Sequence, residues 1–247
     1  MDLASFKNLH PWKINAEEAK ELQKKLAGEL KFTVLGKLPR LIAGVDSAFI
    51  RSGEEEYIIT VIAVLSFPEL EMVEKKFLTN KVSFPYVPTL LTFREGPSFI
   101  KTWKRLNHEP EIVFFDGQGI AHPRLLGMAA HLGLWIDRPT IGVAKSRLFG
   151  IEEQTPVKKG EWYPLFHPED RRIIGATVCT KETSAPLYIS QGNYITLEDS
   201  IRLVLSCVNK QRLPEPTRLA HLLTEKVKKE KKTLDALGSD LLPNSEE

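Results

Sequence analysis

Cysteine is scarce in this chain and is not arranged to bind a metal. Cys179 and Cys207 are the only two cysteines in 247 residues, and neither belongs to a Cys-x-x-Cys pair or a Cys/His cluster. Both stand in apolar segments, so we expect small buried side chains in a reducing compartment. The sequence therefore excludes a disulfide scaffold and argues against a zinc site.

Long hydrophobic runs and internal boundaries are also missing. The N-terminal residues 1–7 lack the apolar core of a signal peptide, and no stretch approaches the length of a membrane span. We therefore expect a cytoplasmic protein with no membrane partner. Because there is no repeat, Gly/Ser linker or compositional break, residues 1–237 are expected to form one domain. The polar tail over 238–247 is expected to be disordered.

Charge of one sign is not in marked excess. The net charge is +2, which permits binding to nucleic acid without arguing for it. A cluster of lysines occupies residues 226–232, at the end of a predicted helix. Such a run is more typical of a solvated helix end than of a binding patch.

The pattern of apolar residues predicts a meander of strands followed by alternating strands and helices. After an amphipathic helix over 15–31, with Asn15 as N-cap and Glu18 completing a capping box, strands are predicted over 40–50, 57–67 and 71–78. Further strands are predicted over 111–115, 140–144, 173–180 and 187–190, and helices over 89–106 (bent or restarted near Gly96 and Pro97), 124–134, 196–209 and 217–232. This order predicts an α/β fold with a mixed central β-sheet flanked by helices. The same layout is that of the ribonuclease-H-like fold, whose active site uses carboxylates on two adjacent central strands.

Asp116 stands in the most informative segment of the chain. It ends a continuous apolar run over 112–115 and is followed by Gly117, Gln118 and Gly119. A carboxylate at the exit of a buried strand projects into the crevice at the sheet edge, and glycines let a phosphate or metal approach the backbone. The alternative is structural, since Asp116 could cap a helix beginning near 124 or form an Asp-Gly turn.

Two other acids stand in unusual settings. Asp46 interrupts the apolar strand over 40–50, where an ionised carboxylate is costly unless it is paired or bound to a cation. Glu95 stands beside Gly96 and Pro97 at the expected helical bend. Three such acids suit Mg²⁺ or Mn²⁺, which serve phosphodiester hydrolysis by activating water and stabilising the leaving oxygen. Their wide separation in sequence makes the convergence an inference from the fold.

Lys145 and His122 complete this set of candidates. Lys145 ends the strand over 140–144, which should lie next to the Asp116 strand, and His122 follows the glycine turn. A lysine at this edge can neutralise a phosphate oxygen or position a water. The alternative is a lysine whose stem simply covers apolar surface at a strand end.

Five segments of the chain closely resemble, in order, motifs of the endonuclease V family, the deoxyinosine 3′ endonucleases. They are Ile42-Ala43-Gly44-Val45-Asp46, Pro85-Tyr86-Val87-Pro88 with Phe93-Arg94-Glu95-Gly96-Pro97, Asp116-Gly117-Gln118-Gly119 with His122-Pro123-Arg124, Ile141-Gly142-Val143-Ala144-Lys145-Ser146, and Leu213-Pro214-Glu215-Pro216-Thr217-Arg218-Leu219-Ala220-His221. The resemblance spans about residues 10–225 and implies a ribonuclease-H-like fold. It implies a DNA repair enzyme, dependent on Mg²⁺ or Mn²⁺, that nicks the second phosphodiester bond 3′ to a deaminated adenine.

The resemblance also assigns roles to residues. The family's metal-binding acids match Asp46, Glu95 and Asp116, its active-site histidine or aspartate matches His221, and its catalytic-region lysine matches Lys145. Its strand-separating wedge matches Pro85, Tyr86, Val87 and Pro88, and the base pocket is expected to involve Gly117, Gly119 and His122. Flanking prolines would hold Tyr86 in an extended loop, where an exposed ring can replace the stacking lost by a flipped base. The alternative is that Tyr86 packs on the core.

Two positions depart from the family pattern. Thr89 stands where many members have glycine after the wedge, which bears on the mouth of the base pocket. Gln118 stands where histidine or asparagine is usual. Neither is a matched catalytic position, so these departures bear on substrate preference and not on the class of activity.

Other functions fit the sequence less well. A dinucleotide-binding enzyme would need a third glycine where His122 stands, and Asp137 precedes its strand instead of ending it. A nucleic-acid-binding module without catalysis would have no use for three acids near a phosphate backbone. The expected partner is therefore deoxyinosine-containing DNA, with inosine-containing RNA as the alternative and no obligate protein partner evident.

Overall fold

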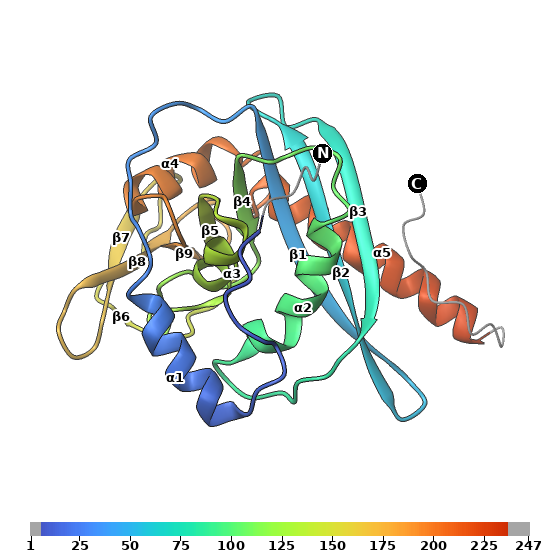
Figure 1. Ribbon diagram of the computed structural model, residues 1–247. Coiled ribbons are helices and arrows are strands. Elements are labelled where there is room, and N and C mark those ends of the chain that lie inside the picture. The colour runs from blue at the N-terminus through green and yellow to red at the C-terminus, as the bar shows by residue number, and fades with distance from the viewer. Residues whose placement is uncertain (1–5, 237–247) are drawn as a thin grey trace.

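The apolar runs of the chain form the strands of one mixed sheet. The computed structural model of the protein describes residues 6–236, so the predicted polar tail over 238–247 lies outside the described residues. Within them, nine strands are hydrogen-bonded in the order β3-β2-β1-β4-β5-β9-β8-β7-β6 (Figure 1). The strands are β1 (Leu41–Ser52), β2 (Glu55–Ser66), β3 (Met72–Lys81), β4 (Ile112–Phe115), β5 (Thr140–Ala144), β6 (Ile151–Glu152), β7 (Trp162–Phe166), β8 (Ile173–Val178) and β9 (Leu187–Gln191).

The predicted meander is confirmed. Strands β1, β2 and β3 pair in antiparallel fashion, and β4 then lies parallel to β1 on its other side. Strand β5 is parallel to β4, as expected for the strands that carry Lys145 and Asp116. The centre of the sheet is therefore β1-β4-β5, three parallel neighbours whose carboxyl ends reach the same edge.

Strands β6 and β7 were not predicted from the sequence. Strand β7 contains Pro164, and a proline normally argues against a strand because it cannot donate to the ladder. Here β6 is so short that it pairs only with Leu165 and Phe166, which leaves Pro164 unpaired on that side. The proline is tolerated because this part of β7 is an edge.

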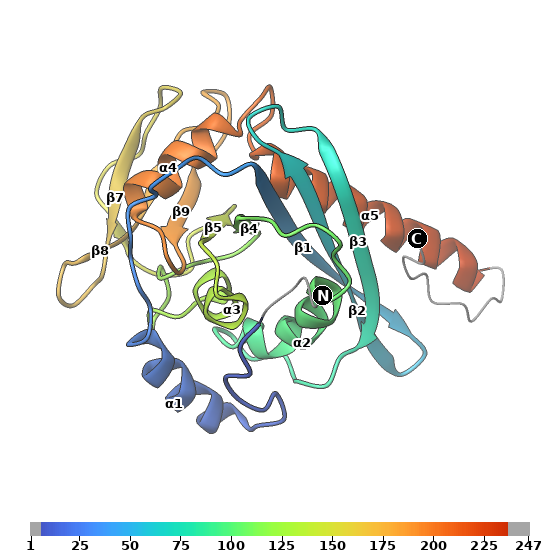
Figure 2. The ribbon, with the colours of Figure 1, turned by 45° about the horizontal axis from the view of Figure 1, so that its top comes forward.

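Helices cover both faces of the sheet, and each face has its own core. Figure 2 shows α2 (Leu91–Trp103) and α3 (Met128–Ile136) on one side, with α1 (Ala16–Ala27) packed outside α3. On the other side lie α4 (Leu197–Ser206) and α5 (Glu215–Ala236). Because side chains alternate along a strand, Ile42 and Phe114 pack with α4 and α5, whereas their neighbours Ala43 and Phe115 pack with α2 and α3.

The helices differ from the sequence prediction at several boundaries, and two of the differences lie close to the site. Helix α3 begins at Met128 and not near Arg124, because Leu125 has a positive φ of 55° and the chain turns there before the helix starts. Helix α2 continues through Pro97 instead of restarting. The capping box of Asn15 and Glu18 at the start of α1 is confirmed.

Two further expectations concern the cysteines and membrane-spanning helices. Both Cys179 and Cys207 are buried free thiols, as predicted. Among the described helices, none combines the length and apolar character needed to cross a bilayer.

Candidate active site

Asp46 and Asp116 are neighbours because two parallel strands present them at the same edge. In the register of β1 and β4, Val45 lies beside Phe115, and the Asp116 N–H donates to the Val45 carbonyl over 3.1 Å. The alternation that turns Ile42 and Phe114 toward α4 and α5 turns Asp46 and Asp116 the same way. The two carboxylates therefore share one face of the sheet.

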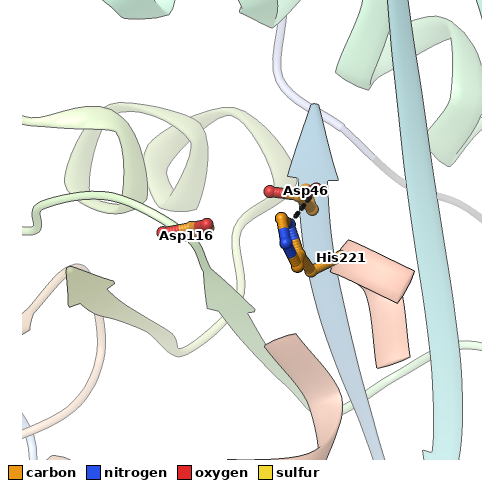
Figure 3. Close-up of side chains that lie close together, drawn as sticks. All are labelled: Asp46, Asp116 and His221. Atoms are coloured by element: carbon orange, nitrogen blue, oxygen red, sulfur yellow. Dashed lines mark hydrogen bonds and ion pairs between the residues drawn. The ribbon is translucent and has the colours of Figure 1, made fainter. Parts of the chain in front are cut away.

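His221 reaches these acids because α5 lies very close to β1. A Cβ built on Gly44 would stand 1.9 Å from the Pro216 carbonyl oxygen, so only glycine permits this approach. The helix then brings His221 Nδ1 to 3.3 Å from Asp46 Oδ2. Figure 3 shows His221 pointing from α5 toward Asp46, with Asp116 across the gap.

The three side chains form a candidate metal site. One ligand atom from each of Asp46, Asp116 and His221 lies within 4.8 Å of the other two. Burial raises the pKa of Asp46, and the nearby charge of Asp116 raises it further. Carboxylates that oppose one another's ionisation fit a hard divalent cation such as Mg²⁺ or Mn²⁺, whose preferred ligands are oxygens.

Glu95 approaches the site from the other face of the sheet. It is buried on α2, and the Ser47 hydroxyl, which follows Asp46 in β1 and alternates to the α2 face, donates to its carboxylate. Burial raises the pKa of Glu95 to about 8, although the Ser47 hydrogen bond opposes this and the charges of Asp46 and Asp116 add to it. Glu95 is thus next to the pair of aspartates but outside the group within 4.8 Å.

Lys145 lies beside Asp116, as the sequence predicted. Its Nζ is 2.5 Å from Asp116 Oδ2. Its backbone carbonyl accepts a hydrogen bond of 2.9 Å from Arg212, which also donates to the Pro186 carbonyl over 2.8 Å. Arg212 was not identified from the sequence, because only the fold brings residue 212 to the end of β5.

A cavity of about 370 Å³ opens beside the acids. The lining residues include Tyr86, Val87 and Pro88 of the loop, together with Asp116, Gly117, Gln118, His122, Met128, Lys145 and Leu148. Tyr86 is 71% exposed, so the expectation of an exposed residue is confirmed and packing of Tyr86 in the core is excluded. Asp116 of the candidate metal site and the loop of Tyr86 therefore border one cavity.

Two predicted binding residues, Gly119 of the base pocket and Pro85 of the wedge, do not line the cavity. Gly119 donates its N–H to Ser190 Oγ over 2.8 Å, so this amide supports the turn and is not offered to the cavity. A Cβ on Gly142 would lie 2.3 Å from that same Gly119 nitrogen, which shows how closely the turn sits on β5. Pro85 is exposed and precedes the part of the loop that lines the cavity.

His122 lines the cavity but uses both ring nitrogens within the protein. Its Nδ1 accepts from the Arg124 N–H over 3.1 Å, so Nε2 carries the proton and donates to the Thr89 carbonyl over 2.9 Å. Burial lowers the pKa of His122 to about 4. His122 is therefore a neutral group that joins two loops, and it can meet a ligand through its ring face.

Known proteins match this chain over most of its length. The family model described as Endonuclease V matches residues 20–222. The endonuclease V of Thermosipho melanesiensis is 44% identical over 225 residues, which cover 91% of this chain and 96% of that protein.

Solved structures agree with the sequence matches. The endonuclease V of Bacillus subtilis superposes with a TM-score of 0.88 at 29% identity, over 93% of this chain and 99% of that one. The endonuclease V of Ciona intestinalis, in complex with a 24mer DNA containing an inosine followed by a ribo-adenosine, has a TM-score of 0.76 at 28% identity, over 87% of this chain and 98% of that one. The mixed sheet with helices on both faces is the ribonuclease-H-like fold of these structures. The chain belongs to the endonuclease V family.

Proposed function

We propose that this protein is a Mg²⁺-dependent endonuclease of DNA repair, with Mn²⁺ able to substitute, that acts on DNA containing deoxyinosine. It would nick the second phosphodiester bond 3′ to the deaminated base. The observation that carries the proposal is the group formed by Asp46, Asp116 and His221 beside the cavity that Tyr86 borders. An acid cluster and a base-sized opening at one sheet edge suit cleavage close to a displaced base.

Each residue of the site has a role that follows from its position. Asp46 and Asp116 would hold the ion, with Glu95 completing the set of carboxylates from the α2 side. When bound, the ion supplies activation of the attacking water and stabilisation of the leaving oxygen. His221 can accept a proton at an imidazole nitrogen or orient a water, and the Lys145 ammonium can neutralise a phosphate oxygen.

Recognition of the lesion would use the loop of Tyr86 and the cavity behind it. The exposed ring of Tyr86 can stack in the space left by a displaced base. Hypoxanthine presents O6 where adenine presents an amino group. Backbone N–H groups at Gly117 or after Pro88 would pair with O6 and would be left unpaired by adenine. The inosine-containing DNA bound to the Ciona relative supports this class of substrate.

The test is cleavage of end-labelled duplexes that differ only in carrying inosine or adenine at one position. We expect nicking of the inosine strand with Mg²⁺, none with EDTA, and loss of activity in Asp116→Asn. Single-stranded substrate should keep the preference in reduced form, because part of it comes from the weaker inosine pair. Equal nicking of both strands would leave only a non-specific nuclease, and binding without any nicking would support a module without catalysis.

Inosine in RNA is the second candidate substrate. The DNA in the Ciona complex carries a ribo-adenosine after its inosine, so that relative binds an inosine site with a 2′-hydroxyl beside it. Matched DNA and RNA strands compared in one assay would decide which polymer this protein cleaves faster.

A further inference from the structure

Thr89 occupies a backbone position that normally requires glycine. The Leu90 N–H donates to the Val87 carbonyl over 3.0 Å, with Pro88 at the second position of this turn. Thr89, at the third position, has a φ of 68°. Proline second and a positive φ third are the features of a type II turn, in which a β-branched residue is strained.

Four hydrogen bonds hold Thr89 in this conformation. Its carbonyl accepts from Gln23 Nε2 at 3.2 Å, from His122 Nε2 at 2.9 Å and from Arg124 Nη2 at 3.1 Å. Its hydroxyl accepts from Arg124 Nη2 at 2.5 Å. The last bond exists because residue 89 carries a side chain, and glycine could not make it.

The groups that hold Thr89 are themselves fixed. Gln23 is fully buried on α1, accepts from Arg124 Nε over 2.7 Å and donates to the Leu126 carbonyl over 3.1 Å. His122 is buried as well. Helix α1 and the turn over 122–126 thus form a rigid support for Thr89.

The loop over 85–88 is attached at its two ends and open between them. Before it, buried Phe84 offers its carbonyl to Arg94 Nη1 at 2.7 Å. After it, Thr89 makes the contacts described above. Between these anchors Pro85, Tyr86 and Pro88 are exposed. The position of the Tyr86 ring therefore depends on the two anchors more than on packing of its own.

We propose that Thr89 and Arg124 form a latch, supported by Gln23 and His122, that fixes the loop of Tyr86 over the cavity before nucleic acid binds. Thr89 and Arg124 are then positioning residues that act through Tyr86. A loop ordered in advance loses less conformational entropy on binding, so the latch favours capture of the substrate and not the chemical step. The expected gain in substrate binding rests on the proposed function. The hydrogen bonds of the latch are those of the free protein and do not depend on that function.

The test uses the full-length protein and two replacements of one residue. Thr89→Val removes the hydroxyl and keeps the branched shape, whereas Thr89→Ser keeps the hydroxyl. In hydrogen exchange of the free protein, we expect the amide of Leu90, which closes the turn on the Val87 carbonyl, to exchange about 3–10-fold faster in Thr89→Val and at the wild-type rate in Thr89→Ser. The exposed Thr183, between β8 and β9, gives the matched control Thr183→Val.

Steady-state cleavage of an inosine duplex with Mg²⁺ supplies a second readout. The KM of Thr89→Val should rise about 3–10-fold while kcat stays within about twofold, because the latch acts on binding. Arg124→Met should raise KM more than Thr89→Val does. The double variant should have the same KM as Arg124→Met alone, because both replacements remove the same contact.

Equal exchange rates in the Val and Ser variants would overturn the latch, as would a fall in kcat with KM unchanged. A wild-type protein that cleaves no inosine strand would overturn the proposed function. The exchange rates of the free protein would then still decide whether the latch exists.

Discussion

Glu95 is an acid held where its charged form is disfavoured. Its pKa is raised to about 8, mainly by burial, whereas in the unfolded chain it would ionise near 4.5. The folded state therefore holds its proton more tightly than the unfolded state does. As the pH rises from about 4.5 to about 8, this group reduces the free energy of unfolding of the metal-free protein, by on the order of 1 kcal/mol per pH unit.

We predict that Glu95→Gln removes this decrease in the free energy of unfolding at high pH. The melting temperature of the metal-free variant should exceed that of the wild type at pH 8 and approach it at pH 5, because glutamine mimics the protonated acid. Thermal unfolding in EDTA across this pH range measures the difference. If the variant were destabilised equally at both pH values, Glu95 would contribute through packing, and its ionisation would not set the pH dependence of stability.

Asp46 and Asp116 differ in their surroundings although they share a site. Asp46 is buried and repelled by its neighbour, while Asp116 has the Lys145 ammonium beside it. Asp46→Asn should therefore raise the melting temperature of the metal-free protein, and Asp116→Asn should leave it level, since relief of repulsion is offset by loss of the ion pair. Each should reduce cleavage by about 100-fold or more, as expected for loss of a metal ligand. Normal cleavage by either variant, or an unfolded variant, would contradict the assignment.

At the scale of elements, the crossing of α5 over β1 decides where His221 lies. Gly44→Ala should force α5 away, because the new Cβ would meet backbone and not a flexible side chain. We expect a loss of about 1–3 kcal/mol in stability, as for overpacked cores, together with reduced cleavage. Gly36→Ala is the matched control, since among the described residues nothing lies within 4 Å of a Cβ there. Urea unfolding of both variants measures the difference in their free energies of unfolding. Equal values would mean that α5 can move away from β1 at no cost in stability.

The loop of Tyr86 is the second element on which the proposed function depends, because its ring would contact the nucleic acid. Because the ring is exposed, Tyr86→Ala should leave the melting temperature unchanged. It should weaken binding to an inosine-containing duplex by about 1–3 kcal/mol, the range for loss of one stacked base. Trp162→Ala, at a half-exposed aromatic residue on β7, controls for loss of any surface ring. Fluorescence anisotropy gives both affinities, and a strong loss of stability in Tyr86→Ala would refute the wedge.

At the scale of the whole molecule, the proposed ion should link the two faces of the sheet. Asp46 and Asp116 lie on one face and Glu95 reaches the site from the other, so a cation bound among them would stabilise the fold. At a concentration of 100 times its Kd, Mg²⁺ should add about 2.7 kcal/mol, a shift of several degrees in the melting temperature. Asp46→Asn at matched ionic strength should show little shift. A shift of equal size in this variant would place the ion elsewhere.

Much of this architecture could be predicted from the order of apolar and polar residues. Asp116 at the exit of one continuous apolar run, and Asp46 within another, indicated buried strands that carry carboxylates. These features are local, since burial on both faces demands a run of apolar side chains whatever the rest of the chain does. The order of the family motifs then identified His221, which no local pattern singles out, and assigned roles to Glu95 and Lys145.

Other parts of the site were decided only by tertiary structure. Ser47, Arg212 and the support of Thr89 by Gln23 depend on residues brought together across the sheet or from different helices. A single serine or glutamine carries no periodic signal, so its partner cannot be read from its neighbours in the chain. The role of Gly119 also changed, because its amide is taken by Ser190 of β9, a strand 71 residues away. Hydrophobic periodicity is local, so the order of residues alone predicted which segments are buried and which carboxylates would cost free energy to bury. The fold alone determined which hydrogen bonds those polar groups make, because their partners are distant in sequence.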